Sequence, residues 1–299
     1  MSRLRIEHFG ARGSADGRSV EIGGSTTRWL IQFGYDGRSF SGWARQPGQT
    51  TVEGTLRDGL RRHGIGGRTA AGSLEVASRT DAGVSARANA LTLTSDWAAP
   101  ALLRALNGIS PRIFFRAATE VPDGFRVRHA RFRQYRYFLD GGPERVERLQ
   151  PIADRLGHRV DARSFGRGLP AAEPKFRPLN RITVRHDGVV AWIEVEAPSF
   201  VWGMVRKIVT GLGEVESGRR SAAELERAAL GEQRLTLALA PPEPLVLWAV
   251  EYDRPWSHVA ARLSRHQEAH LREMDRQARL LPALRRAIGF GSGDPPPSG

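Results

Sequence analysis

An aspartate two residues after an arginine is the feature of this sequence that most directly suggests chemistry. Residues 78–84 read SRTDAGV, with Arg79 and Asp81 at the centre. We expect these residues to form a loop that leaves a strand, so that the arginine holds the carboxylate ionised and aims it. Such a carboxylate can attack an electron-poor sugar carbon or stabilise an oxocarbenium-like centre. On these residues alone, a surface Arg–Asp pair in a tight turn is the simpler explanation.

The elements that must position this loop can be predicted from hydrophobic periodicity and turn residues. A helix begins with a capping box formed by Thr50 and Glu53 and stops at the next His-Gly pair. Its Val52, Leu56 and Leu60 recur every four residues and form a buried stripe. Around this helix we predict strands over residues 28–34, 74–77, 90–94, 113–121 and 131–139, and a second helix over 100–106.

Residue types alternate along the strand predicted over 131–139. Every second side chain of a strand lies on the same face. One face therefore carries Arg131, Arg133, Tyr135, Tyr137 and Leu139. Alternation alone predicts that Tyr135 is a half-buried tyrosine of a strand.

A polar segment over 141–155 is predicted to separate two halves of the chain. In the second half, strands flank the turn His186-Asp187-Gly188, which predicts a hairpin. Helices follow over 199–211 and 222–230, and a last strand over 245–252. Strands and helices mixed with several hairpins favour an α+β fold. The expected divisions are a flexible extension (1–27), an N-terminal half with Asp81 (28–140), a C-terminal half (141–256), and a basic helix with a disordered tail (257–299).

The composition indicates a soluble protein with a polyanionic partner. The chain has 299 residues and a net charge of +13, and 43 of its 45 basic residues are arginines because only Lys175 and Lys207 are lysines. Arginine suits bidentate phosphate contacts and stacking on bases, although a coding bias gives the same count. There is no cysteine, no apolar run of membrane-spanning length and no apolar core of a secretory signal near the N-terminus. We expect a cytoplasmic protein.

Three further segments of the sequence, here called blocks, accompany the SRTDAGV block, one before it and two after it. Residues 35–46 read YDGRSFSGWARQ, residues 125–137 read FRVRHARFRQYRY, and residues 200–206 read FVWGMVR. The four blocks lie within residues 28–256 and together resemble the tRNA pseudouridine synthase A family, which modifies the 3′ side of the anticodon stem-loop. The resemblance implies a pseudouridine synthase fold, in which two α/β halves with mainly antiparallel sheets meet at a central basic cleft.

The resemblance implies a role for each matched residue. Asp81 would be the catalytic aspartate, which attacks C1′ of the target uridine or otherwise assists cleavage of the C1′–N1 bond. Arg79 would pair with Asp81 and help to hold the target nucleotide out of its stack, and Tyr135 would stack on the target base. Arg206 would lie close to the aspartate. The residues expected to contact RNA are Arg206, Arg128, Tyr35, Gln46 and Lys207. From the residues alone, Arg206 could equally be a helix-surface residue and Arg128 part of the general basic surface.

The resemblance also implies a homodimer that binds tRNA across both subunits and needs no metal, nucleotide or redox cofactor. Two other classes are a catalytically silent RNA-binding protein on the same fold and an Asp-dependent hydrolase. The first is disfavoured because Asp81, Arg79 and Tyr135 occur together, and the second because Asp81 lacks a neighbouring carboxylate to hold Mg²⁺. The chain departs from the common family pattern at Ser85, where a histidine is usual. The uridines that it modifies could therefore differ from those of the best-known members.

Overall fold

The computed structural model describes residues 26–65, 74–168, 175–259 and 262–287. The predicted N-terminal extension, apart from its last two residues, and the predicted C-terminal tail lie outside these residues. Within the described ranges, no helix is both long and apolar enough to cross a membrane.

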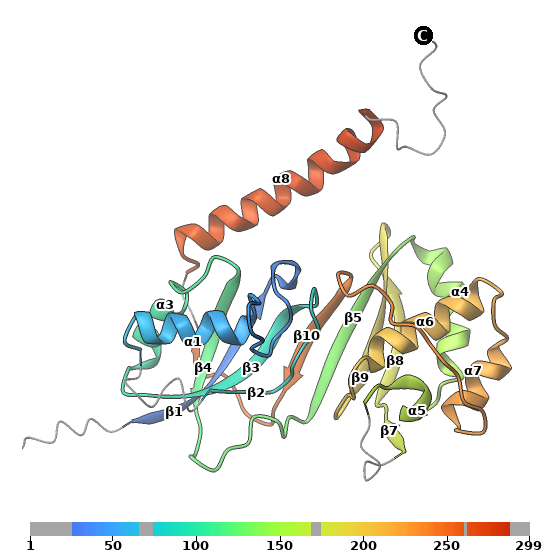
Figure 1. Cartoon of the computed structure of the whole chain (residues 1–299), viewed down its shortest axis with the longest axis horizontal. Helices are drawn as coiled ribbons and strands as arrows, with labels where there is room; N and C mark the ends of the chain where they lie inside the picture. Colours follow the sequence, from blue (N-terminus) through green and yellow to red (C-terminus); the bar gives the residue numbers. More distant parts are fainter. Residues whose placement is uncertain (1–25, 66–73, 169–174, 260–261, 288–299) are drawn as a thin grey trace, which may run out of the picture.

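One mixed sheet runs through the protein, in the strand order β11-β4-β1-β3-β10-β5-β9-β8, with β2 paired to β3 (Figure 1). Every pairing is antiparallel except that of β10 with β3. The expected α+β class with mainly antiparallel strands is confirmed. The strands are β1 (Thr27–Tyr35), β2 (Glu75–Val76), β3 (Ser85–Ser95), β4 (Ile113–Glu120), β5 (Phe132–Asp140), β8 (Arg181–His186), β9 (Val190–Ala197), β10 (Leu245–Glu251) and β11 (His258–Val259). A separate two-stranded sheet pairs β6 (Arg159–Asp161) with β7 (Phe176–Pro178).

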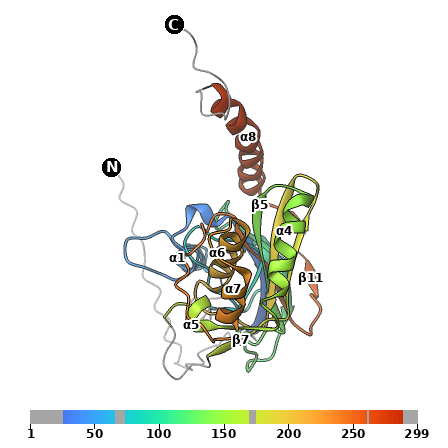
Figure 2. The ribbon, with the colours of Figure 1, turned by 90° about the vertical axis from the view of Figure 1, so that its right-hand side faces the viewer.

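The helices lie mainly on one side of the large sheet, where Figure 2 shows α1, α6 and α7 on the same face, although Figure 1 shows α1 at the opposite end of the sheet from α6 and α7. Helix α4 occupies most of the predicted boundary segment and packs against β8 and α6. The last helix, α8, projects away from the body (Figures 1 and 2). The helices are α1 (Val52–Arg62), α3 (Ala99–Leu106), α4 (Pro143–Asp154), α5 (Ala162–Phe165), α6 (Met204–Glu216), α7 (Ala222–Ala229) and α8 (Arg265–Ala287), with a 3-10 turn η1 (Gly37–Ser39).

Helix α1 confirms the predicted stripe but not the predicted cap. Val52, Leu56 and Leu60 are all buried. The N-cap is Thr51, whose extended backbone lets its hydroxyl accept a hydrogen bond from the Gly54 N–H at 3.2 Å. The capping box predicted from Thr50 is therefore wrong by one residue, because the side chain that reaches the free N–H groups of the first turn is that of Thr51.

Helix α6 begins five residues later than the periodicity predicts. Gly203 has a φ of +75°, a left-handed conformation that interrupts helical geometry, and the helix starts at Met204. Phe200 and Val201 consequently lie in the segment before the helix rather than on its apolar face. The left-handed conformation of Gly203 therefore determines where the side chains in the first turn of α6 lie.

The parallel pair of β10 and β3 joins the two halves of the chain. Strand β10 lies between β3 and β5, with Val246 opposite Ser85 and Leu247 opposite Ala86. Because the two strands run in the same direction, the loops that precede them leave the same edge of the sheet. The Asp81 loop therefore lies beside residues 240–244.

Candidate active site

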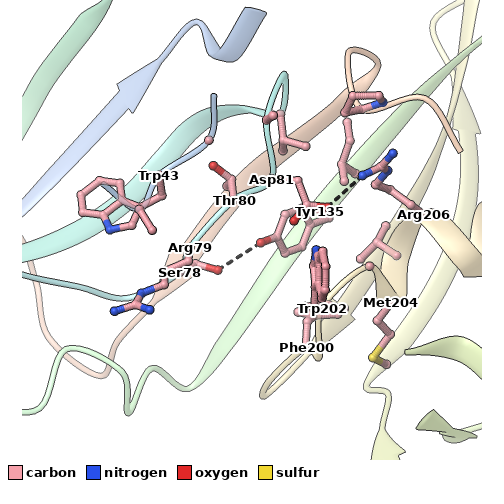
Figure 3. A pocket seen from close by; sticks show the side chains of 18 of the residues that line it. Trp43, Ser78, Arg79, Thr80, Asp81, Tyr135, Phe200, Trp202, Met204 and Arg206 are labelled. Carbon is pink, nitrogen blue, oxygen red and sulfur yellow. Dashed lines mark hydrogen bonds and ion pairs between the residues drawn. The ribbon is translucent and has the colours of Figure 1, made fainter. Parts of the chain in front are cut away.

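A cavity of about 1100 Å³ lies where the Asp81 loop, strand β5 and the first turn of α6 meet (Figure 3). Its walls come from segments that are far apart in the sequence. They include Gln46, Arg79, Asp81, Arg128, Arg133, Tyr135, Phe200, Trp202 and Arg206. All four sequence blocks thus contribute to one cavity.

The Asp81 loop is fastened to the loop that follows β1. The Trp43 N–H donates to the Thr80 carbonyl at 3.1 Å, and the Gly83 N–H donates to the Phe40 carbonyl at 3.2 Å. Gly42, with a φ of +87°, lets the two loops approach so closely that a Cβ atom there would lie 3.0 Å from the Thr80 oxygen. Hydrogen bonds and close backbone packing therefore fix the loop that carries Asp81.

The carboxylate of Asp81 pairs with Arg206 of helix α6. Its Oδ2 lies 2.9 Å from the guanidinium Nη1, and the Arg206 Nε donates to the Ala240 carbonyl at 2.6 Å. Both side chains are mostly buried, with exposed fractions of 24% for Asp81 and 13% for Arg206. The loop before β10 thus aims the guanidinium, and the guanidinium orients the carboxylate in the cavity (Figure 3).

The predicted pair between Arg79 and Asp81 is wrong. Arg79 is exposed, and Figure 3 shows its guanidinium on the side of the loop away from Asp81. The chain turns at the aspartate, because the Val84 N–H donates to the Asp81 carbonyl, and anchored Thr80 separates the two side chains. Arg79 instead lies between the cavity and a neighbouring hollow of about 510 Å³, whose walls also include Arg126 and Arg128.

Tyr135 lines the same cavity as Asp81. Its hydroxyl lies 3.0 Å from the Ser78 Oγ, and its ring meets Phe200 edge to face with centroids 5.0 Å apart. Burial raises the pKa of the Tyr135 phenol, partly offset by the Ser78 hydrogen bond and by the charge of Arg133. The phenol is therefore protonated near neutral pH and rigidly held.

Arg133 shares the buried face of β5 with Tyr135, as the alternation predicts, but its role in the site was not predicted. Its guanidinium donates to the carbonyls of Pro198, Ala77 and Arg128 at 2.6, 3.0 and 2.7 Å. It thus joins the segment before α6, the start of the Asp81 loop and the third sequence block. The alternation is the available signal, because it places Arg133 on the same face of the strand as Tyr135.

Two residues expected to contact RNA do not reach the cavity. Tyr35 is buried, burial raises the pKa of its phenol, and its hydroxyl lies 2.7 Å from the Thr80 Oγ1, so it supports the Asp81 loop from behind. Lys207 is also buried, and its Nζ donates to the Ser164 and Gly166 carbonyls at 3.1 and 2.8 Å. Neighbouring backbone and side-chain oxygens already engage the polar atoms of Tyr35 and Lys207, and neither residue lines the cavity, so their contacts with RNA stay a prediction from the sequence.

The remaining predicted contacts lie where a ligand could meet them. Gln46 and Arg128 are exposed and line the cavity. The Gln46 Nε2 donates to the Ser41 carbonyl at 3.0 Å, which holds the amide at the rim. Ser85, by contrast, does not line the cavity, and its Oγ accepts a hydrogen bond from the Gly37 N–H at 3.0 Å. At the position where the family usually has histidine, this side chain braces the loop that follows β1.

Comparison with known proteins identifies the family of the chain. A family model described as tRNA pseudouridine synthase matches residues 156–253. The chain is 36% identical to the tRNA pseudouridine synthase A of Thermococcus kodakarensis over 227 residues, which are 74% of this chain and 84% of that protein. It is 34% identical to the same-named protein of Methanoculleus marisnigri over 241 residues, 79% of this chain and 87% of the relative. The resemblance inferred from the four sequence blocks is confirmed, and the chain belongs to the tRNA pseudouridine synthase A family.

Proposed function

We propose that this protein isomerises uridine to pseudouridine in the anticodon stem-loop of tRNA, with Asp81 as the catalytic carboxylate. The observation that carries the proposal is the Asp81–Arg206 pair inside a cavity shared by all four sequence blocks. The reaction breaks the C1′–N1 bond, rotates the base and forms a C1′–C5 bond, after which C5 loses its proton and N1, freed from the sugar, gains one. Composition and redox state are unchanged, so these steps require no added group.

Asp81 suits both chemical routes to that bond cleavage. As a nucleophile it would form a bond to C1′ as the N1 bond breaks, and as a stabilising anion it would stand against an oxocarbenium-like centre. Arg206 orients the carboxylate for both routes through its bonds to Asp81 and to the Ala240 carbonyl. The proposal is therefore independent of which route operates.

In this proposal Tyr135 serves as a surface on which the target base stacks, and not as a phenolate that removes a proton. Burial raises the pKa of its phenol, so proton abstraction by the tyrosinate is disfavoured near neutral pH. The ring is instead fixed by Ser78 and Phe200 with its surface lining the cavity. Turning a base out of its stack costs a few kcal/mol of free energy, and stacking on an aromatic surface of this kind offsets that cost.

The test of the reaction is pseudouridine formation on unmodified tRNA transcripts, mapped by position. We expect the natural sequence to modify uridines on the 3′ side of the anticodon stem-loop and Asp81→Asn to form no pseudouridine while it still binds RNA. Asp96→Asn is a matched control, because Asp96 is an exposed aspartate that does not line the cavity. Turnover by Asp81→Asn would contradict the mechanism. If the natural sequence binds RNA but forms no pseudouridine, the alternative function, a catalytically silent RNA-binding protein, is favoured instead.

We also propose a basic cleft for the RNA backbone along the two neighbouring hollows. Arg79 and Arg128 line both, and Arg126 lines the second. Arginine contacts to phosphates release counterions, so affinity should fall steeply as salt rises. We expect Arg79→Ala to lower RNA affinity and to reduce the slope of log affinity against log salt by about one unit. An unchanged salt slope in this variant would mean that Arg79 does not contact phosphate.

A homodimer and a cytoplasmic location remain predictions from the sequence. The family resemblance implies RNA bound across two subunits, and the absence of cysteine suits a reducing compartment. Sedimentation of the full chain with and without tRNA tests the first, since a monomer that binds one tRNA would contradict it.

A further inference from the structure

An exposed tryptophan stands at the mouth of the cavity. Trp202 lines the cavity with Tyr135 and Phe200, and 55% of its surface is open to solvent. Figure 3 shows its ring among the side chains that line the cavity. A large apolar ring exposed beside a functional cavity indicates a surface that a ligand covers, because burying it is favourable.

The position of this ring is set by the backbone around it. Gly203 adopts its left-handed conformation directly after Trp202, and the Arg167 N–H donates to the Trp202 carbonyl at 3.0 Å. Lys207 holds the neighbouring segment through the carbonyls of Ser164 and Gly166. The buried lysine of helix α6 therefore stabilises the loop that lies against the tryptophan.

A guanidinium covers part of the indole. The Arg167 Cζ lies 4.6 Å from the Trp202 ring centroid. A stacked guanidinium keeps its N–H donors in its own plane, free to bind an anion. Burial lowers the pKa of the nearby Lys207 ammonium, and repulsion from the cations Arg167 and Arg234 lowers it further. An aromatic surface next to clustered cations suits a ligand that is flat and apolar at one end and anionic at the other.

We propose that Trp202 and Arg167 form a second nucleotide site, in which an unpaired base next to the target uridine stacks on the indole and its phosphate binds the guanidinium. The inference rests on the proposed function, because the two nucleotides belong to one RNA. The site would hold the strand open on one side of the target while Tyr135 lines the target cavity. Stacking of this kind tolerates all four bases, since each base has an aromatic face.

Equilibrium binding of an unmodified anticodon stem-loop RNA tests the second nucleotide site in the absence of the reaction. Every variant is made in the full-length Asp81→Asn chain. We expect Trp202→Ala to bind about 10-fold more weakly, the scale of one lost base stack, and Trp202→Phe to recover part of the loss. Leu230→Ala is the control, because Leu230 is 47% exposed and does not line the cavity, and we expect its affinity to be unchanged.

Abasic RNAs identify the stacking partner. Removing the base that stacks on Trp202, at one position near the target uridine, should weaken binding to the Asp81→Asn chain by the same factor as Trp202→Ala does. The same abasic RNA should bind the Trp202→Ala variant no more weakly than the intact RNA does. Arg167→Gln should reduce the slope of log affinity against log salt by about one unit. The proposal is overturned by unchanged affinity of Trp202→Ala, by an equal loss on every abasic RNA, or by altered sedimentation of Trp202→Ala, which would mean that the ring packs against a second copy. These readouts need no activity, so a chain that binds RNA but forms no pseudouridine would contradict the proposed function alone.

Discussion

At the scale of single residues, the partner of the Asp81 carboxylate comes from a distant part of the chain. Arg206 lies 125 positions further along and approaches the carboxylate from helix α6, whereas the neighbouring Arg79 points away. A local Arg-x-Asp pattern could not show this, because the loop turns at the aspartate. The cation that orients Asp81 therefore depends on how the two halves of the chain pack.

Arg206 should matter more to turnover than to folding. Replacing it with alanine removes the group that aims Asp81, and we expect kcat/KM to fall by about 100-fold, as when one preorganised donor is removed from an active site. Arg206→Lys keeps the charge but cannot make both contacts, so it should recover only part of the loss. Single-turnover kinetics on tRNA transcripts measure both variants.

Arg220→Ala is the matched control for this prediction. Arg220 pairs with Glu214 at 2.8 Å, with exposed fractions of 18% and 20%, and it does not line the cavity. Its loss should leave kcat/KM unchanged. An equal loss in both variants would mean that Arg206 serves general stability rather than the site.

Motif residues identify a site more reliably than they identify the direction of each side chain. The four blocks predicted correctly that Asp81, Tyr135 and Arg206 come together. They did not distinguish Tyr35 and Lys207, which lie behind the site, from residues that line it. Side-chain direction depends on tertiary hydrogen bonds, such as those from Lys207 to the 164–166 segment, and no single-sequence pattern encodes them.

At the scale of elements, the start of helix α6 determines where Arg206 lies. We expect Gly203→Ala to destabilise the protein by about 1–2 kcal/mol, because a side chain is disfavoured at positive φ. Its Cβ would also lie 2.7 Å from the Leu239 Cδ2, which lines the cavity. Turnover should fall beyond the loss of stability as the first turn of α6 shifts. Chemical unfolding and kinetics under fully folded conditions separate the two effects.

Gly213→Ala in the same helix is expected to have the opposite effect on stability. A Cβ at Gly213 would have no atom within 4 Å, and the residue lies inside regular helix. Alanine there should stabilise the protein by about 0.5–1 kcal/mol and leave turnover unchanged. Similar behaviour of the two glycine variants would show that the left-handed turn does not position the site.

Elements with strong periodicity could be predicted, and their ends could not. The buried stripe of α1 and the hairpin of β8 and β9 follow from local pattern. The start of α6 depends on the conformation of one glycine, and β3 extends back to Ser85 because β10 pairs with it there. Pairing with a strand that lies 161 residues later has no signal in the local sequence.

At the scale of the whole molecule, strand β10 ties the two halves of the chain into one sheet. This strand of the second half lies between β3 and β5 of the first half, and its parallel pairing with β3 brings the 240–244 loop to the Asp81 loop. Gly83 shows how close this approach is, because a Cβ there would lie 3.0 Å from the Pro242 side chain. The site can thus form only when both halves are folded.

The two halves should consequently unfold as one cooperative unit. We expect far-UV circular dichroism and tryptophan fluorescence to give coincident denaturant transitions. Leu247→Ala, at a fully buried position of β10, should cost about 2–5 kcal/mol and should lower amide protection in β1 and β9 together. Val189→Ala, at an exposed hairpin turn, should change neither. Two separate transitions, or lost protection in one half alone, would show that the halves fold independently and that the cavity between them can open without global unfolding.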